Sequence, residues 1–190
     1  MIRISNRPHK YGLLVISFVL AIGFTQCGTR RATSPENIAI QTCFSPKGKC
    51  AQFVIDAVNK AQKSILVQAY YFTSIAIAEA LVQAHKDGVN VRMLIDKSQL
   101  EYPRTRVYHM AKAGIPVAVD KVAGSAHSKV MIIDNDYVLT GSFNWTQAAE
   151  YRNVENLILI KDRTTNKIYR KAWHLRAKKA VPLPKKKLKQ

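Results

Sequence analysis

The chain has 190 residues, enough for one domain with appended ends and for a hydrophobic core that is stable without disulfide bonds or a structural metal. Hydrophobic residues make up 47% of the sequence, which excludes a chain that is disordered throughout. The formal net charge is +18 at pH 7, with three of the surplus positive charges in residues 1–27, nine in residues 170–190 and six between them. A basic surface attracts polyphosphates and anionic membranes alike, so charge predicts an anionic partner without choosing between nucleic acid and lipid.

The first 27 residues have the pattern of an export segment. Arg3, Arg7 and Lys10 precede an apolar run over residues 11–24, as in a secretory signal sequence. The run is shorter than the roughly 20 apolar residues that span a bilayer. We therefore predict a signal sequence or membrane anchor over residues 1–27, followed by a linker over residues 28–37. The protein is expected to be exported, either periplasmic or secreted, or else anchored through residues 11–24 because small residues at a clean cleavage site are missing.

Two cysteines follow in the first part of the predicted domain. Cys43 and Cys50 flank a Ser-Pro-Lys-Gly segment that is typical of a turn, which would bring the two thiols within bridging distance. In an oxidising compartment a disulfide is expected, and two unpaired thiols are the alternative that the sequence leaves open. No further ligands accompany the pair, so we predict no metal site.

From there the chain alternates strand and helix patterns. Apolar and β-branched runs predict strands at residues 38–42, 64–72, 89–95, 115–119, 129–133, 137–140 and 154–160. Apolar residues at helical spacing predict helices at residues 50–62, 74–88, 105–113 and 164–179. This order predicts the α/β class, with a mixed β-sheet flanked by helices in a domain over residues 38–179. Two prolines in residues 181–184 end the last helix, and residues 180–190 are expected to form a basic tail.

The residues best suited to catalysis lie around the strand hairpin. His127 and Lys129 are two apart, a spacing that on a strand places both side chains on one face, and we expect this polar pair to open an otherwise buried strand. Ser142 and Asn144 follow the second strand and, with Lys129, offer the cation and the neutral donors that phosphoryl oxygens require. Glu155 opens the next strand, where a carboxylate accepting from one imidazole nitrogen would leave the other free to attack. Each of these residues alone is more often structural or solvated, and only their conjunction suggests a site.

The pattern His127-x-Lys129, four residues, Asp134, six residues, Gly141-Ser142-x-Asn144 resembles that of the phospholipase D superfamily at every position. Residues 38–178 are similar to its short bacterial single-motif branch, which contains exported endonucleases and proteins called phospholipase D. The resemblance implies a phospholipase D-like fold and places Glu155 as the outlying carboxylate. Asp134 and Gly141 would be structural members of the motif, with Gly141 also allowing close approach of a ligand to the backbone.

What this resemblance implies is a phosphodiesterase that uses two histidines and no metal or other cofactor. One imidazole attacks phosphorus, and a second protonates the leaving oxygen and then activates water. His127, Lys129 and Glu155 would be catalytic, and Lys129, Ser142 and Asn144 would bind phosphate. The chain holds one His-x-Lys set, so a homodimer is the simplest source of the second.

Two substrates remain open on the sequence. The basic body and tail favour an endonuclease of low specificity acting on nucleic acid. The apolar N-terminus favours a phospholipase D acting on phosphatidylcholine-type lipids, and the tail also suits contact with an anionic membrane. Four aromatic residues could meet acyl chains, although core packing is the favoured role for most of them: Tyr70, Tyr71, Phe72 and Trp145. A module that only binds its ligand is the third interpretation, which the intact motif disfavours.

Overall fold

The computed structural model describes residues 38–184. The predicted signal or anchor segment, the linker over residues 28–37 and the last part of the tail lie outside the described residues. Within residues 38–184 no helix is both long enough and apolar enough to cross a membrane.

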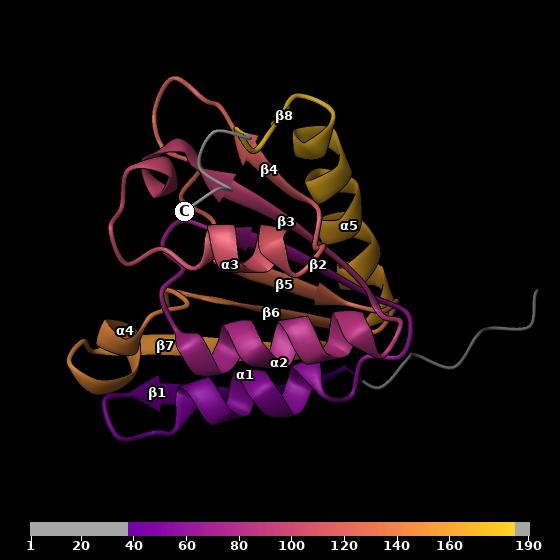
Figure 1. Cartoon of the computed structure of the whole chain (residues 1–190). Helices are drawn as coiled ribbons and strands as arrows, with labels where there is room; N and C mark the ends of the chain where they lie inside the picture. The colour runs from indigo at the N-terminus through magenta and orange to yellow at the C-terminus, as the bar shows by residue number, and fades with distance from the viewer. Residues whose placement is uncertain (1–37, 185–190) are drawn as a thin grey trace, which may run out of the picture. The chain divides into compact units, whose positions relative to one another are not determined.

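One eight-stranded sheet organises the described chain, in the spatial order β1-β7-β6-β5-β2-β3-β4-β8 (Figure 1). Strands β2, β3 and β4 are mutually parallel, and every other neighbouring pair is antiparallel. The strands are β1 Ala39–Ser45, β2 Ser64–Ala69, β3 Asn90–Asp96, β4 Val117–Asp120, β5 Val130–Ile133, β6 Tyr137–Gly141, β7 Glu155–Lys161 and β8 Val181–Pro182. The predicted mixed sheet flanked by helices is therefore confirmed.

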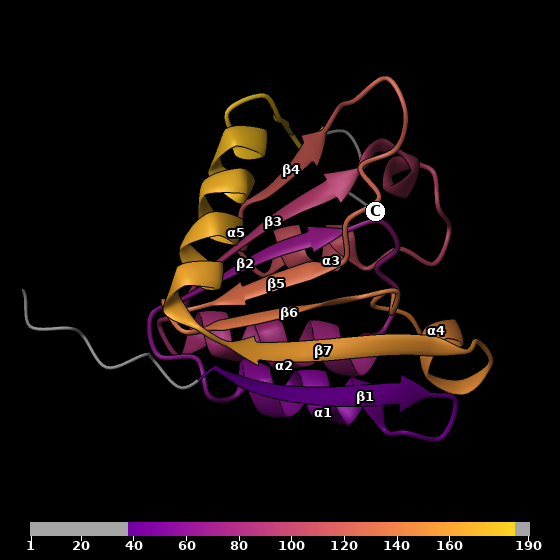
Figure 2. The same cartoon turned by 180° about the vertical axis from the view of Figure 1, so that it is seen from behind.

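Helices cover both faces of this sheet unequally. Helices α1, α2 and α3 lie over one face, whereas α5 alone crosses the other (Figure 2). The helices are α1 Cys50–Val58, α2 Ile75–Lys86, α3 Val107–Lys112, α4 Gln147–Tyr151 and α5 Arg163–Ala177, with one short 3₁₀ turn, η1, at Lys97–Leu100. The sequence did not predict η1 or α4, because four or five residues are too few for a helical period to show.

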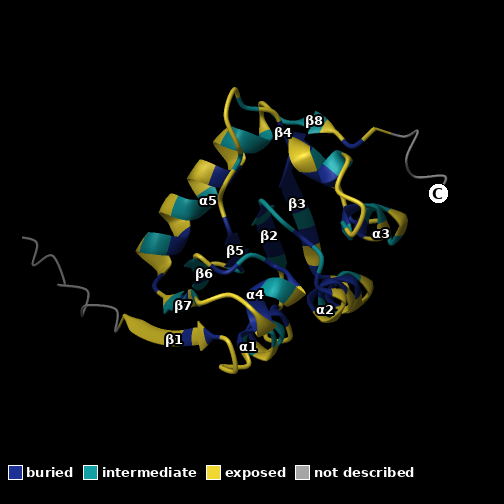
Figure 3. Ribbon diagram, turned by 90° about the vertical axis from the view of Figure 1, so that its left-hand side faces the viewer, coloured by how far each residue is buried: buried dark blue, intermediate teal, exposed yellow. Residues whose placement is uncertain are grey.

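The core has two layers because the central strands are buried on both sides. Along β2, Ile65 and Val67 pack towards α1 and α2, while Leu66 packs towards α5. This alternation explains why the central strands are almost continuously apolar in sequence. Trp173 joins α5 to the sheet: it is 1% exposed, and its indole Nε1 donates to the Val67 carbonyl at 3.0 Å. Figure 3 shows the contrast between this buried centre and the exposed edge strand β1.

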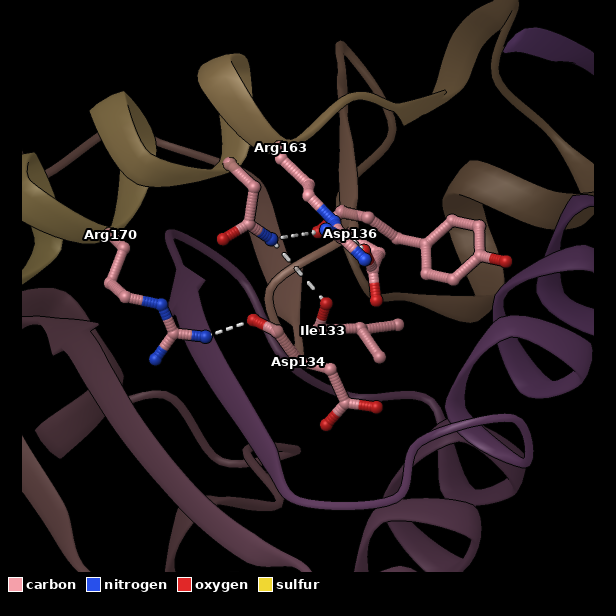
Figure 4. A network of polar contacts seen from close by, with 7 residues as sticks. Ile133, Asp134, Asp136, Arg163 and Arg170 are labelled. Atoms are coloured by element: carbon pink, nitrogen blue, oxygen red, sulfur yellow. Dashed lines mark hydrogen bonds and ion pairs between the residues drawn. The ribbon is translucent and has the colours of Figure 1, made fainter. Parts of the chain in front are cut away.

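The hairpin turn between β5 and β6 lies beside α5, and Arg170 of this helix points to the Asp134 carbonyl (Figure 4). Asp134 also ties the turn to the start of β2. Its carboxylate accepts from the backbone N–H groups of residues 62, 63 and 64 at 2.7–2.8 Å. Asp134 has φ 48°, a left-handed conformation that aspartate tolerates better than most residues. Arg170 donates to its carbonyl, and Arg163 pairs with Asp136 at 3.0 Å. The arrangement explains why a carboxylate stands here: it holds two strand ends together.

The described chain continues the sheet past the predicted end of the domain. Val181 pairs with Val119 in an antiparallel register, and Leu183 is buried. The prolines end α5 as expected, but the segment that follows adds the edge strand β8 instead of leaving the domain at residue 179. Near the other end, Cys43 of β1 and Cys50 of α1 form a disulfide.

Candidate active site

The predicted site residues converge at one end of the sheet, where β5 begins, β6 ends and β7 begins. The antiparallel pairings of Val130 with Thr140 and of Gly141 with Leu157 bring these three strand ends side by side. The parallel strands β2 and β3 finish at the same end, since Gln68 pairs with Val130. His127, Asn144 and Glu155, which come from three separate parts of the chain, can therefore line one pocket.

His127 and Lys129 lie in the extended segment just before β5. The strand begins at Val130, so strand alternation does not explain their proximity. Instead, the Lys129 ammonium folds back on the preceding residues: Nζ lies 3.0 Å from Nδ1 and 3.3 Å from Nε2 of His127, and it donates to the His127 carbonyl at 2.8 Å. His127 is exposed, while Lys129 is only 6% exposed. A solvent-accessible imidazole thus stands directly beside a buried cation.

Gly141 makes room for a sharp backbone arrangement after β6. A Cβ on this residue would collide with the backbone carbonyl of Asn156. That carbonyl accepts from the N–H groups of both Ser142 and Phe143, at 3.1 and 3.2 Å. The close approach that the glycine permits is therefore with the neighbouring strand, and its consequence is the placement of Ser142.

Ser142 and Glu155 form a pair across the site. Ser142 Oγ donates to Glu155 Oε2 at 2.5 Å and accepts from the N–H of Asn156 at 3.0 Å. The second carboxylate oxygen of Glu155 accepts from Asn153 Nδ2 at 2.9 Å. The expectation that Glu155 accepts from the His127 imidazole is not met within this chain, because both of its oxygens are engaged by Ser142 and Asn153.

Asn144 completes the set. Its Oδ1 accepts from the backbone N–H of Tyr71 at 3.4 Å, which leaves the Nδ2 group to donate to a ligand. His127, Lys129, Ser142, Asn144 and Glu155 all line one open pocket of about 700 Å³. A cation, a hydroxyl, an amide and an imidazole around one open space match the needs of a phosphoryl group with its negatively charged oxygens.

The charge of Lys129 is set by two opposing influences. Burial lowers the pKa of the Lys129 ammonium, and the nearby Glu155 carboxylate opposes this effect without cancelling it. The lysine therefore carries a proton that is more easily lost than that of an exposed lysine.

Asp96 and Lys97 hold the loop that carries His127, and neither was predicted from the sequence as part of the site. Asp96 Oδ2 accepts from the N–H of Ala126 at 2.6 Å, and Oδ1 accepts from Ser98 at 2.9 Å. Lys97 Nζ donates to the carbonyls of residues 122 and 123. Burial acts to raise the pKa of Asp96, but the donors at Ser98 and Ala126 outweigh it and lower the pKa below 3.8. The signal was visible, since Asp96 ends a buried parallel strand, where polar residues commonly face a site.

Among the aromatic residues that the sequence offered as contacts for acyl chains, Phe72 and Trp145 are buried in the core, whereas Tyr70 lies beside the histidine. Its ring lies against the His127 imidazole, with centroids 4.2 Å apart, and Lys129 Nζ lies 4.9 Å from its centroid. The ring thus packs against both members of the histidine–lysine pair. Asp134, in contrast, lies at the opposite end of β5 from His127 and takes no part in this pocket.

Comparison with known proteins places this arrangement in a family. A family model described as a cardiolipin synthase, PLD-like domain matches residues 54–174. The chain belongs to the phospholipase D superfamily. A protein named phospholipase D from Rickettsia conorii is 37% identical over 168 residues, which cover 88% of this chain and 84% of that protein. A mitochondrial cardiolipin hydrolase from Xenopus laevis is 34% identical over 113 residues, covering 60% of this chain and 54% of the relative.

Solved structures of this superfamily share the fold. The phospholipase D family member Nuc from Salmonella typhimurium superposes with a TM-score of 0.74 at 34% identity, covering 77% of this chain and 98% of Nuc. NucT from Helicobacter pylori has a TM-score of 0.71 at 21% identity, with 77% and 99% covered, and shows likeness of fold alone. The chain is therefore a phosphodiesterase hydrolase of the phospholipase D superfamily. Within residues 38–184, no three His, Cys, Asp or Glu side chains cluster as a metal site would require.

Proposed function

We propose that this phosphodiesterase is an endonuclease of low sequence specificity, which hydrolyses nucleic-acid phosphodiester bonds through a covalent phosphohistidine on His127. The observation that carries the proposal is the open pocket in which an exposed imidazole stands among Lys129, Ser142 and Asn144. An exposed imidazole beside the donors of Lys129 and Asn144 has the layout that nucleophilic attack on a phosphodiester needs. The Ser142 hydroxyl joins these donors when it turns from Glu155 to a bound phosphate.

The reaction proceeds in two balanced steps. In the first, a ring nitrogen of His127 forms a bond to phosphorus while the bond to the leaving oxygen breaks, and a second imidazole supplies a proton to that oxygen. In the second, the same imidazole takes a proton from water, which attacks phosphorus and breaks the nitrogen–phosphorus bond. Lys129, Ser142 and Asn144 stabilise the charge on the non-bridging oxygens throughout.

The second imidazole comes from another copy of the chain in a homodimer. The other described histidines have different surroundings: His109 pairs with Glu79 on α2, His174 packs against Trp173 on α5, and His85 lies at the end of α2. None of them lines the pocket of about 700 Å³. A two-fold symmetric pair would present both His127 side chains to one phosphate.

The lining of the pocket favours nucleic acid over lipid. Val130 is the one aliphatic residue that lines the pocket. The other lining residues are polar, apart from Gly141 and the Tyr169 ring. A phospholipid would gain from an apolar wall for its acyl chains, whereas a nucleic acid gains from the basic body of the protein. The alternative, a phospholipase D that releases the headgroup of phosphatidylcholine-type lipids, is favoured by the name of the Rickettsia relative.

Two incubations test the substrate. Purified protein with supercoiled plasmid in EDTA is expected to produce nicked and linear DNA, and phosphatidylcholine vesicles are expected to release no choline. Choline release without nicking would replace the nuclease by the lipase. Nicking that requires added divalent metal would contradict the histidine mechanism.

The oligomeric state tests the source of the second imidazole. Sedimentation at the concentrations used for turnover is expected to show a dimer, and an active monomer would refute the shared site. Trapping with a labelled phosphodiester should leave acid-labile phosphate on the wild-type chain. Labelled phosphohistidine in a His127→Ala chain would show that the nucleophile is another residue.

Export remains part of the proposal. The Cys43–Cys50 disulfide supports an oxidising compartment, since such bonds persist mainly outside the cytosol. Fractionation of cells that express the full chain is expected to place it outside the cytoplasm, either free or on a membrane.

A further inference from the structure

A row of aromatic rings leads away from the His127 imidazole. The imidazole lies 4.2 Å from the Tyr70 ring, which lies 4.5 Å from Tyr71, which in turn lies 5.1 Å from Tyr102, all measured between centroids. The two tyrosine–tyrosine spacings fall within the range for interacting aromatic rings, and the imidazole lies slightly closer to Tyr70. The row begins at the end of β2 and reaches the loop after η1, where Tyr102 is 37% exposed. The row therefore extends from the nucleophile to a part of the surface outside the phosphate pocket.

The two outer rings of this row, Tyr71 and Tyr102, line a second groove of about 760 Å³. Asn144 lines both this groove and the phosphate pocket, so the two spaces adjoin at that residue. The groove lies between the loop that follows β3 and the short helix α4, which are at the same end of the sheet (Figure 1). Tyr151 of α4 faces it with 72% of its surface exposed. A polymer held at the phosphate pocket can therefore continue into this groove.

Three arginines add positive charge to the same groove. They are Arg104 and Arg106 on the loop before α3, and Arg152 at the end of α4. Within residues 38–184 none of their guanidinium groups has an ion pair or a side-chain hydrogen bond, and the buried Nε of Arg106 lacks a partner. A buried donor left unsatisfied is costly, and guanidinium groups are well suited to phosphate oxygens.

The chemistry of the groove selects one kind of occupant. Exposed rings interleaved with arginines form the combination that holds unpaired bases by stacking and the backbone by charge. Paired bases in a duplex are already stacked on one another and cannot use such rings. Acyl chains would need a continuous aliphatic wall, and the groove offers only Ile75, Pro103 and Ala148 of that kind.

We propose that this groove binds an unpaired nucleic-acid strand beside the scissile phosphate and thereby makes single-stranded nucleic acid the preferred substrate. The proposal rests on the proposed function, because it names the form of nucleic acid that the His127 site receives. Tyr71 and Tyr102 stack on the bases that flank the cleaved bond, and Arg104, Arg106 and Arg152 bind their phosphates.

Binding without cleavage tests the groove. The full chain carrying His127→Asn is titrated with a fluorescein-labelled single-stranded oligodeoxynucleotide of about 12 nucleotides, a length within the usual site sizes, and with the matched duplex. Fluorescence anisotropy is expected to show affinity for the single strand about tenfold above that for the duplex. Tyr102→Leu is expected to weaken single-strand binding by about tenfold, as loss of one stacked base does.

Two matched variants separate stacking and local charge from general effects. Tyr102→Phe keeps the ring and is expected to bind as the unmodified chain does. Arg104→Gln should weaken binding and reduce the salt slope by about one phosphate contact, whereas Lys112→Gln removes the same charge from the exposed side of α3 and should not. Circular dichroism of each variant establishes that it is folded, and Tyr102 and Arg104 are both exposed side chains.

Two results would contradict the proposal that the groove binds an unpaired strand. Equal affinity for single strand and duplex would do so, as would unchanged binding by both Tyr102→Leu and Arg104→Gln. If the same two substitutions instead abolish binding to phosphatidylglycerol vesicles while oligonucleotide binding persists, the groove faces a lipid surface. Hydrolysis of bis(4-nitrophenyl) phosphate by the wild-type chain is measured separately: its absence refutes the phosphodiesterase site, and its presence with no strand preference refutes the groove alone.

Discussion

Two aspartates at opposite ends of the sheet do the same chemical work for different purposes. Asp134, after β5, accepts three backbone N–H groups from the start of β2, and Asp96, at the end of β3, accepts those of Ser98 and Ala126. Asp134 belongs to the family motif and holds only strand ends. Asp96 lies outside the motif, yet it holds the residue next to His127.

Residues that are close together in the sequence motif are therefore not all close to the reacting phosphate. The four-residue strand β5 separates the His127–Lys129 pair from Asp134, so His127 and Asp134 lie at opposite ends of this strand. The residue that positions the nucleophile comes instead from β3, which β2 separates from β5 in the sheet, through a contact across 30 positions of sequence. Substitutions at these positions distinguish residues that act in the reaction from residues that stabilise the sheet.

His127→Asn should have the largest effect. Removal of the nucleophile is expected to lower kcat on a phosphodiester by about 10⁴-fold or more, as for other covalent catalysts. The side chain is exposed, so the free energy of unfolding, measured by urea titration, should stay within about 0.5 kcal/mol of the wild-type value. Rates from a quenched-flow or gel assay measure the first quantity, and a large loss of stability would mean that His127 is structural.

Asp134→Ala should instead act on stability. It removes three charge-assisted hydrogen bonds, and we expect a loss of about 2–3 kcal/mol in the free energy of unfolding, measured by urea titration. Below the transition, kcat of the folded protein should remain within about threefold of wild type. A loss of kcat at full stability would place Asp134 in the reaction after all.

Asp96→Asn should separate positioning from folding. The amide keeps one oxygen but cannot accept from both Ser98 and Ala126 as the carboxylate does, so the loop before His127 should shift. Small displacements of catalytic groups are costly, and we expect kcat to fall by about 10- to 30-fold with KM nearly unchanged. Stability should fall by about 1 kcal/mol. A rise in KM at constant kcat would indicate a role in substrate binding instead.

The pH profile should show the smallest effect, and it concerns Lys129. Because burial lowers the pKa of this ammonium, activity should decline with rising pH at values below lysine's usual 10.5. In Lys129→Arg the charge persists, so the alkaline limb should move to higher pH even though the bulkier group lowers the overall rate. An alkaline limb that stays in place in Lys129→Arg would assign it to another group.

The same lysine contributes to stability with a definite sign. Its folded pKa lies below its unfolded value, so the unfolded chain binds more protons between the two values. Its burial therefore costs stability at neutral pH, and that cost is relieved as pH rises through this interval. Asp96 behaves oppositely: its lowered pKa stabilises the fold above about pH 4, and this contribution is lost as pH falls through the folded pKa.

Much of the fold could be predicted from local patterns. The buried strands β2, β3 and β5 are apolar because helices cover both of their faces. The helices α2 and α5 are capped by Ser74 and Asp162, whose side chains accept hydrogen bonds from the backbone N–H groups three residues further on. The short elements η1, α4 and β8 could not be predicted, because their few residues are held by tertiary contacts instead of an internal period.

The groups that carry out the chemistry can be recognised in the amino-acid sequence: an imidazole, an ammonium, a hydroxyl and an amide at fixed spacing, on a chain with alternating strands and helices. The place of each group, in contrast, depends on the tertiary structure. It turned Glu155 towards Ser142 and Asn153, moved Asp134 to the far rim, and brought Asp96 and Tyr70 to His127. Hydrogen bonds and ring contacts across a sheet depend on which strands lie near one another, and the local spacing of residues does not specify the order of the strands.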